Sequence, residues 1–575
     1  MSPARHVDPC LRVGAVVGGA LVPKWVALLL DDLDTCMSIE LTDLIIGPPG
    51  ESGGDAPAPR GRGLKAFARC DERLFGRRLD FLAPADLGDW ASSHGIELST
   101  ATAALATTLE PSDHLSAEGP DIVLDLTEGN GCLLAAKGAC GEVWWTKGVP
   151  TRVGRVHVDL PGVVTGALRG SQVTAFELCA RTSGCDGSVV LVTGFCPTHP
   201  TSPLMTGDCL AASARQLIFE KLKASSLRRI SPSLEEPAGD QGRGTASPDV
   251  TAKGRVSRPA SARRPTAGIG LCTTGAYFVR TAKRQARRAV LEKQWHLLVG
   301  EQRPDQQAPD PSCLQPLVPE PGYYWADPFA VVYEGQTHLF FEEFVYDSRR
   351  GRIAAITLDG QGRPGRKAVA LELDSHLSYP CIFTHEGRVY MVPESADRGT
   401  VELYECMDMP DKWVRRRTVV SGVQLVDASL VEWRGLWWMF ASLKKPAGLR
   451  TAELLMLYMS ENPVTGTWRQ HPSNPLLADV TNARPAGAPF VLGEKLYRPA
   501  QDGSGGYGWA IALNEVLSLT PDSYLDRRVT TVRPDWSRAV CGTHTLNRAG
   551  NTVVMDACRY MLRDPRRPRA DSLLD

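Results

Sequence analysis

The chain has 575 residues, of which 43% are hydrophobic and 22% are charged, and its formal net charge is −1. This length exceeds what one hydrophobic core supports, so we expect several domains. Because the net charge is close to zero, no global electrostatic attraction favours nucleic acid, and nucleic acid is not an expected partner.

The 15 cysteines are scattered between Cys10 and Cys558, with no CxxC pair and no cluster at zinc-ligand spacing. We therefore expect free thiols in a reducing compartment, with no metal and no cofactor. The apolar run at 12–33 could pass for a signal peptide, but Lys24 interrupts it and no cleavage site follows. No other segment approaches the roughly 18 apolar residues that span a membrane, so the sequence predicts a cytoplasmic protein.

Residues 10–226 alternate short apolar runs with helical stretches. The runs VGAVVGG (13–19) and DIVLDL (121–126) are typical of buried strands, whereas residues 208–224 have helical periodicity. This alternation predicts an N-terminal α/β domain.

A change of composition follows this domain. Residues 227–270 are rich in Pro, Gly, Ser and Arg and nearly lack large apolar side chains, which predicts a disordered linker. Residues 271–294 are expected to form a helix whose basic face could contact phosphates or an anionic membrane, or could simply be solvated. That face consists of Arg280, Lys283, Arg284, Arg287 and Arg288.

From 295 to 562 the helical signal disappears and short apolar or aromatic runs alternate with turn residues, an all-β signature. The runs form five similar units, and a short tail at 563–575 is expected to be disordered. When one residue of each unit is aligned in a column, a glycine follows eight residues later every time. The column residues are Asp327, Tyr379, Asp427, Pro485 and Gly542, at intervals of 52, 48, 58 and 57 residues. Repeated hairpins at this spacing predict a five-bladed β-propeller, with a sandwich of hairpins as the alternative.

Propeller geometry brings the column residues together, because the first strand of each blade lines the centre. We therefore expect Asp327, Tyr379 and Asp427 to converge, with Glu342 and Glu394 at the ends of the second strands. Carboxylates together with aromatic side chains such as Trp325 and Tyr379 suit a sugar site. The alternative is structural, since an Asp before Pro often forms a turn and a Glu pair can end a strand.

The fourth and fifth units differ from the first three. Arg484 and Arg498 suit a phosphate or carboxylate group on a ligand, and Gln501 and Asp502 stand nearby in the sequence. His544 is either a satisfied hydrogen-bonding residue or, with less support, a metal ligand.

The motifs WADPF, FFEEF, LSYP, YMVPES, VDASL, ARPAG, LYRPAQD and GTHTLN occur in this order. Together they resemble a bacterial family whose propeller is similar to the N-terminal domain of plant glucosamine inositolphosphorylceramide transferases, over about 295–560. More distantly, the fold is similar to the five-bladed arabinanase, levansucrase and invertase superfamily, including family 43 glycosidases. This resemblance implies that Asp327 is a general base or nucleophile and that Asp427 tunes the acid. The chain departs from the glycosidases at the acid itself, where Arg484 begins the corresponding motif, so Glu394 or Glu342 would have to substitute.

The N-terminal domain resembles formyltransferases over about 10–225, but the motif is incomplete. Trp144 and Thr146 occupy places where that family has its Asn and His, and only Asp186 matches the third group. Without the His no general acid or base remains for formyl transfer, so we expect an inactive or repurposed domain.

Three functions are therefore compared. The first is an enzyme acting on glycosidic bonds, by transfer or hydrolysis, in glycoconjugate or polysaccharide assembly. The second is a non-catalytic module that binds a sugar or sugar phosphate and assists a separate glycosyltransferase. The third is residual formyl or acyl transfer in the N-terminal domain. Enzyme and binder are expected to differ in whether a carboxyl group or an arginine lies beside Asp327.

Overall fold

The structure is a computed structural model. It describes residues 10–46, 81–94, 99–100, 120–127, 141–151, 170–182, 187–199, 202–230, 290–303, 305–444 and 451–562, with single positions at 71, 73, 163, 279, 282, 283 and 286. The predicted linker beyond residue 230 and the predicted C-terminal tail lie outside the described residues.

The N-terminal region contains one seven-stranded sheet in the order β5-β3-β1-β6-β7-β8-β9. Its central strands β3, β1, β6 and β7 are parallel, and β8 and β9 continue the sheet antiparallel. The elements are β1 (Leu11–Val17), β2 (Leu21–Pro23), α1 (Lys24–Thr35), β3 (Ile39–Ile46), β4 (Pro84–Asp86), α3 (Leu87–His94), β5 (Ser99–Thr100), β6 (Ile122–Leu126), β7 (Glu142–Lys147), β8 (Val173–Thr182), β9 (Val189–Pro197) and α6 (Pro203–Ile230).

The strands predicted at 13–19 and 121–126 correspond to β1 and β6, and the predicted helix at 208–224 lies inside α6. The likeness of this region to a formyltransferase stays a prediction. Among the described helices, none is both long enough and apolar enough to cross a membrane.

The predicted basic helix ends earlier than expected. Residues 291–294, assigned to that helix from the sequence, belong to strand β10 (Leu291–Glu301). β10 pairs with the C-terminal strand β31 (Thr552–Leu562) along its whole length, from Leu291 opposite Leu562 to Glu301 opposite Thr552. This long-range pairing overrides the local helical periodicity. Of the predicted basic face, only Lys283 lies among the described residues.

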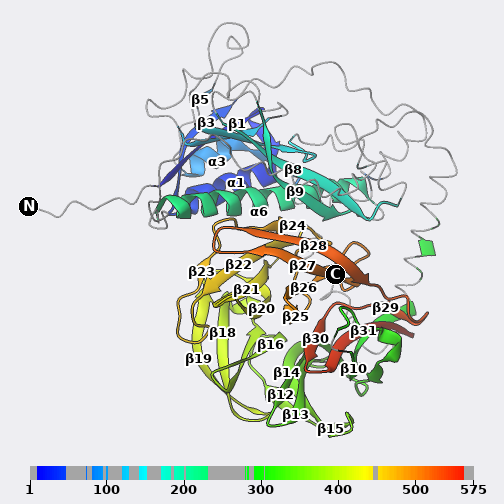
Figure 1. The fold of residues 1–575 in the computed structure, drawn as a ribbon. Coiled ribbons are helices and arrows are strands. Elements are labelled where there is room, and N and C mark those ends of the chain that lie inside the picture. Colours follow the sequence, from blue (N-terminus) through cyan, green and yellow to red (C-terminus); the bar gives the residue numbers. More distant parts are fainter. Residues whose placement is uncertain are drawn as a thin grey trace, which may run out of the picture.

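Five sheets form the five blades of a β-propeller, which confirms the predicted architecture (Figure 1). Blade 1 is β12 (Tyr323–Tyr333), β13 (Gln336–Val345), β14 (Arg350–Leu358) and β15 (Pro364–Leu371). Blade 2 is β16 (Ser378–His385), β17 (Arg388–Glu394), β18 (Thr400–Asp408) and β19 (Lys412–Ser421). Blade 3 is β20 (Leu425–Trp433), β21 (Leu436–Leu443), β22 (Leu454–Ser460), β23 (Arg469–Gln470) and β24 (Leu477–Ala478). Blade 4 is β25 (Phe490–Leu492), β26 (Lys495–Asp502), β27 (Ala510–Leu519) and β28 (Tyr524–Val532).

Blade 5 closes the ring by combining both ends of the propeller sequence. It contains β10 and β11 (Gln315–Leu317) from the start and β29 (Val540–Gly542), β30 (Leu546–Ala549) and β31 from the end. Since β10 and β31 are neighbours in one sheet, the closing blade cannot open without breaking the longest strand pair described in the propeller.

The predicted glycine turns are present in all five units. In the first three, the glycine is the second turn residue and both turn residues have positive φ, as in Glu334 (49°) and Gly335 (78°). In the last two, Gly493 and Gly550 are the first turn residues. Pro485 and Gly542 are therefore one residue out of register with Asp327, so the sequence column holds only for blades 1 to 3.

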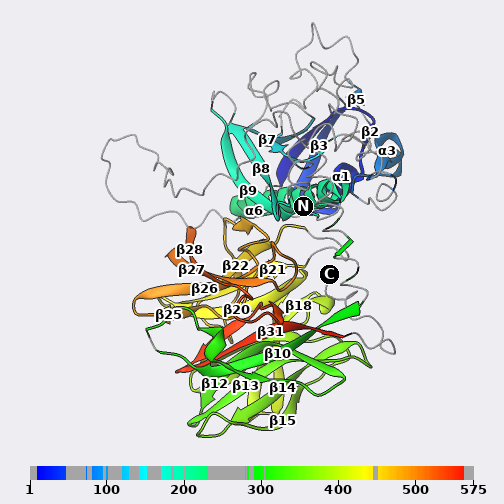
Figure 2. The ribbon, with the colours of Figure 1, turned by 90° about the vertical axis from the view of Figure 1, so that its right-hand side faces the viewer.

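The N-terminal sheet and α6 lie beside blades 3 and 4 (Figures 1 and 2). The Ala452 amide donates to Ser213 Oγ at 2.9 Å, the Val480 amide donates to the Phe195 carbonyl at 3.0 Å, and Lys221 Nζ donates to the Ser473 carbonyl at 2.8 Å. One cluster of buried apolar side chains extends through both regions. The two regions thus share a packed interface.

Candidate functional site

The three column residues Asp327, Tyr379 and Asp427 share a strained backbone. Their φ angles are 51°, 43° and 54°, and each lies at a register break in the first strand of its blade. Left-handed φ at a non-glycine residue costs on the order of 1–3 kcal/mol and is concentrated at functional sites. The repeat therefore places the same strained bulge in the first strand of three successive blades, near the centre of the propeller.

Asp327 is buried on β12 and is held by residues of blade 5. Its Oδ1 accepts a hydrogen bond from Thr545 Oγ1 at 2.7 Å and lies 3.8 Å from His544 Nε2. Its backbone N–H donates to Asp556 Oδ2 at 3.2 Å. Burial raises the pKa of Asp327 to about 6, with Asp427 and Asp556 adding to the rise and His544 opposing it.

Asp427 is equally buried, but its carboxylate is fully engaged. Arg484 donates from Nε to Oδ2 at 2.5 Å and from a terminal nitrogen to Oδ1 at 3.3 Å, and Gln501 Nε2 donates to Oδ2 at 3.0 Å. Although burial alone would lower it, the carboxylate of Asp427 keeps the pKa of Arg484 well above its ordinary value. The Asp427 backbone N–H donates to Glu394 Oε2 at 3.2 Å.

Glu342 and Glu394 complete the acidic cluster. Burial raises the pKa of Glu342 well above its ordinary value and Asp327 adds to this, while Tyr324, which donates its hydroxyl to Glu342 at 3.2 Å, opposes it. Burial and then Asp427 raise the pKa of Glu394 in the same way, with Arg484 opposing. Burial thus favours the neutral form of both glutamic acids.

The second residue of the Glu-Glu pair has a different role. Glu343 points to the opposite face of β13, as the two-residue period of a strand requires. There it pairs with Arg352 at 2.8 Å and with Lys367, and it accepts from Trp325 Nε1 at 3.1 Å. Trp325 packs beside an apolar cluster between the sheets. Trp325 therefore lies with Glu343 on the face away from Glu342, and its role as a ligand contact stays a prediction.

Tyr379 is at the centre but is not available to a sugar ring. Its side chain is fully buried, and its hydroxyl contacts Ser429 Oγ at 2.7 Å and accepts from the Gly487 amide at 2.5 Å. Phe329 packs edge-on against the ring. The Tyr379 hydroxyl therefore links its own blade to Ser429 and Gly487, and its role as a substrate contact stays a prediction.

We expect Tyr379→Phe to lower the free energy of unfolding by about 1–3 kcal/mol, because it leaves the buried Gly487 amide without an acceptor. Tyr458→Phe is the matched control, since the Tyr458 hydroxyl is buried without a hydrogen-bond partner among the described residues. Chemical denaturation of both variants measures the difference. Equal losses for the two variants would contradict the bracing role of the Tyr379 hydroxyl.

Arg498 and Asp502 do not reach the acidic cluster. Arg498 is fully buried between blades 3 and 4, where it pairs with Asp526 at 2.5 Å, and Asp502 pairs with Arg528 at 3.3 Å. Both lie on one face of β26, whereas Gln501 lies on the other face and reaches Asp427. Gln501 thus contacts the acidic cluster and Arg498 and Asp502 do not, and the substrate-binding roles of the three residues stay predictions.

His544 lies at the centre with a partner that sequence reasoning missed. Its Nδ1 is 2.5 Å from Asp556 Oδ2, and its ring stacks on Trp295 with 4.2 Å between centroids. Asp556 is fully buried within the apolar run VVMDA, and an acidic residue inside such a run was the only available signal.

Asp327, His544 and Asp556 offer ligand atoms within 4.8 Å of one another, a spacing compatible with a cation. However, both ring nitrogens of His544 face carboxylate oxygens, at 2.5 and 3.8 Å. Despite burial, Asp556 and Asp327 raise the pKa of His544, which favours the protonated imidazole. Two carboxylates that face one imidazole account equally for this spacing, and the absence of a metal stays a prediction from the sequence.

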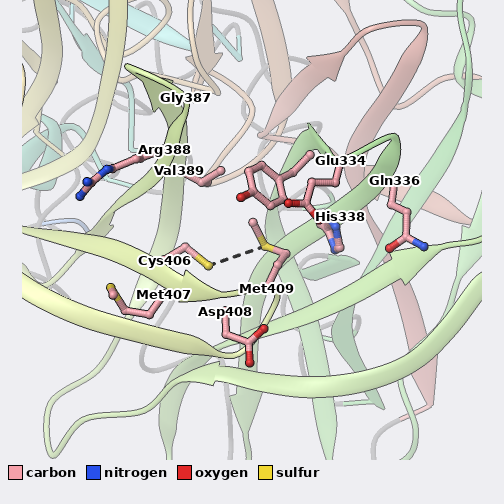
Figure 3. A pocket seen from close by; sticks show the side chains of 11 residues that line it. Glu334, Gln336, His338, Gly387, Arg388, Val389, Cys406, Met407, Asp408 and Met409 are labelled. Atoms are coloured by element: carbon pink, nitrogen blue, oxygen red, sulfur yellow. Dashed lines mark hydrogen bonds between the residues drawn. The ribbon is translucent and has the colours of Figure 1, made fainter.

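A separate cavity of about 310 Å³ opens between blades 1 and 2, further along β12 than Asp327 (Figure 3). The β12–β13 and β16–β17 turns form it together with Cys406 and the three residues that follow. Cys406 Sγ and Met409 Sδ are 3.9 Å apart there, and Arg388 pairs with Glu405. None of the predicted site residues lines this cavity.

Fold and site together define a five-bladed propeller with a buried acidic cluster at its centre. Residues 315–542 match the family described as Glucosamine inositolphosphorylceramide transferase 1, N-terminal. A protein of Oryza sativa subsp. japonica named Glucosamine inositolphosphorylceramide transferase 1 is 34% identical over 219 residues, covering 37% of this chain and 29% of that protein. Its counterpart in Arabidopsis thaliana is 31% identical over 212 residues, covering 36% and 28%. The chain thus spans less than a third of these curated relatives.

Solved structures of glycoside hydrolases are also similar. The family 117 glycoside hydrolase Zg3597 of Zobellia galactanivorans has 13% identity and a TM-score of 0.31, covering 41% of this chain and 85% of its own. CoXyl43, a GH43 β-xylosidase/α-arabinofuranosidase from a compost microbial metagenome, has 10% identity and a TM-score of 0.32, covering 43% and 93%. These values are too low to support a conclusion about activity.

Proposed function

We propose that the propeller is carbohydrate-active and makes or breaks glycosidic bonds, with Asp327 as general base or nucleophile. The names of the plant relatives support a role in assembling a glycoconjugate, and polysaccharide assembly is the related expectation from the sequence. Glycosyl transfer and hydrolysis use the same pair of groups, an ionised carboxylate and a protonated carboxylic acid.

The observation that carries the proposal is the contrast in ionisation inside one cluster. Burial raises the pKa of Asp327 to about 6, whereas it raises the pKa of Glu342 and of Glu394 well above the ordinary value of a glutamic acid, which favours their neutral form. Pairs of titratable groups whose environments separate their pKa values identify acid and base assignments.

The contacts of these groups assign their roles. Among the described residues, Asp327 Oδ2 makes no hydrogen bond, so this oxygen can accept a proton from a hydroxyl or attack a sugar carbon. Glu394 accepts the Asp427 amide at Oε2 and also shares a hydrogen bond with the Asp427 side chain, and we assign it as the proton donor. Burial and then Asp427, which Arg484 holds in place, raise the pKa of Glu394 and so favour its protonated form.

The test is a screen of sugar nucleotides, oligosaccharides and aryl glycosides with the wild type, Asp327→Asn and Asp502→Asn. We expect turnover by the wild type and a loss of about 10³-fold or more in Asp327→Asn with ligand binding retained. Activity should be retained in Asp502→Asn, because the Asp502 carboxylate pairs with Arg528 and accepts the Ser504 amide, away from the acidic cluster. If all three proteins bound a ligand and none of them turned it over, the result would contradict an enzymatic function and favour a binding module.

A sugar-phosphate-binding module is the second candidate, and Arg484 is the observation that favours it. The Arg484 guanidinium lies over the Tyr507 ring, 5.4 Å from its centroid, and 15% of the side chain is exposed. However, Asp427 already neutralises this arginine. If recognition of an anion were the function, inorganic phosphate would compete with the bound sugar, and Asp427→Asn would tighten the binding of phosphate.

Three further expectations stay predictions. Asp186, the one residue that matches the formyltransferase motif, lies outside the described residues, as does most of the basic face proposed to contact an anionic membrane. The described Trp144 donates its Nε1–H to Glu142 and is buried in the sheet, so it offers no acid or base. A cytoplasmic location is likewise proposed from the sequence alone.

A further inference from the structure

Asp556 makes more contacts than a strand residue needs. It lies on β31 with no solvent exposure. Its Oδ1 accepts from the amides of His544 and Thr545, at 2.7 and 3.1 Å. Its Oδ2 lies 2.5 Å from His544 Nδ1 and accepts the Asp327 amide at 3.2 Å. One carboxylate thus fixes the β29–β30 connection and the strained backbone of Asp327 together.

His544 is immobilised between this carboxylate and Asp327. Its ring stacks on Trp295 at 4.2 Å and meets Tyr507 edge-on at 5.4 Å. A Cβ at Gly508 would approach Trp295 to 2.5 Å, so the backbone closes tightly around the stack. The ring cannot turn away, and its Nε2 remains 3.8 Å from Asp327 Oδ1.

We propose that Asp556 is the positioning residue of the site: acting through His544 and the Asp327 amide, it fixes Asp327 with Oδ1 engaged and Oδ2 free to react. The reactivity of Oδ2 rests on the proposed function, whereas the positioning of Asp327 does not. Thr545 supplies the second contact to Oδ1. The other titratable groups that act on Asp327 come from all the surrounding elements. They are Asp427, Glu342, Glu394, Tyr324 and Tyr507.

A comparison with Asp427 separates positioning from simple bracing. The Asp427 amide is also held by a carboxylate of the preceding blade, Glu394, so this backbone bond is a repeated structural device. At Asp427 the carboxylate is neutralised directly by Arg484. At Asp327 the carboxylate that holds the amide, Asp556, is also the counter-ion of His544, which faces the Asp327 carboxylate. A purely structural role for Asp556 would not require this histidine.

The test follows the ionisation of His544 and Asp327 in the full chain without substrate. The imidazole of His544, assigned in NMR spectra by its loss in His544→Gln, is expected to titrate above the ordinary range in the wild type and at a lower pH in Asp556→Asn, where Asp556 no longer opposes the effect of burial. The pKa of Asp327 in the folded protein is obtained from the divergence pH, defined as the pH at which the difference in stability between the wild type and Asp327→Asn stops growing as the pH rises. In the His544→Gln background this pH is expected to rise by about one or more, because the neighbouring cation is removed.

His338→Gln is the matched control, since His338 is a buried histidine of blade 1 bonded to Thr357. It should leave the divergence pH unchanged. If Asp556→Asn does not fold, Thr545→Val serves instead, because losing the hydroxyl at Oδ1 should also raise that pH. An unchanged His544 titration in Asp556→Asn, or an unchanged divergence pH in both His544→Gln and Thr545→Val, would overturn the proposal. Failure of the glycosidic function would appear only in turnover, so the two failures are distinguishable.

Discussion

Replacing Arg484 with Met is expected to lower the free energy of unfolding by about 3–5 kcal/mol, because it leaves the Asp427 carboxylate buried without its cation. Arg484 donates two hydrogen bonds to that carboxylate, and Asp427 is only 2% exposed. Gln501 alone would remain as a donor to Oδ2, and a neutral amide cannot compensate a buried charge. Urea denaturation followed by tryptophan fluorescence measures the loss.

Two comparisons show whether the stranded charge is the cause. Adding Asp427→Asn to Arg484→Met should recover most of the loss, because no charge is then left unpaired. Arg527→Met removes an exposed partner of Glu515 and should cost less than about 1 kcal/mol. If the double variant were as unstable as Arg484→Met, lost packing of the arginine, and not the stranded carboxylate, would be the cause.

The architecture was accessible from sequence because it repeats. Glycine turns at regular intervals predicted the hairpins, and the shared column predicted that Asp327 and Asp427 approach the centre, as the structure confirms. What the column could not show is the left-handed φ at both aspartates. A bulge reorients the side chain of the residue at which it occurs. Neither Asp nor Tyr at the column position indicates from the sequence that a bulge is present there.

The differences between expectation and structure at individual residues have physical causes of the same kind. Arg498 and Gln501 are three positions apart on one strand, so strand alternation sends them to opposite faces, and only knowledge of the register decides which face is inward. Asp556 belongs to no column, because the hairpin of blade 5 is shifted relative to the first three. Residues 291–294 follow a helical pattern locally. The strand that pairs with them, β31, is more than 250 residues away in the sequence, so the local pattern could not indicate this pairing.

Asp327→Asn should stabilise the protein above pH 6 while it removes turnover. The pKa of Asp327 is raised from its ordinary 3.8 to about 6 in the folded state, so between these values the folded protein binds more protons than the unfolded chain. The stability of the wild type therefore falls as the pH rises through this window, by at most about 3 kcal/mol from this group. Asn cannot ionise and avoids that loss.

We accordingly expect Asp327→Asn to be more stable than the wild type by about 1–3 kcal/mol at pH 8 and nearly equal to it at pH 4, as measured by denaturation at both pH values. Asp502→Asn, which breaks an ion pair with Arg528, should show no such gain. A variant that is less stable than the wild type at pH 8 would mean that the imidazolium of His544 stabilises the Asp327 carboxylate more than burial penalises it. A gain at pH 8 would mean that the ionised carboxylate destabilises the fold, and a group kept at that cost is one retained for its chemistry.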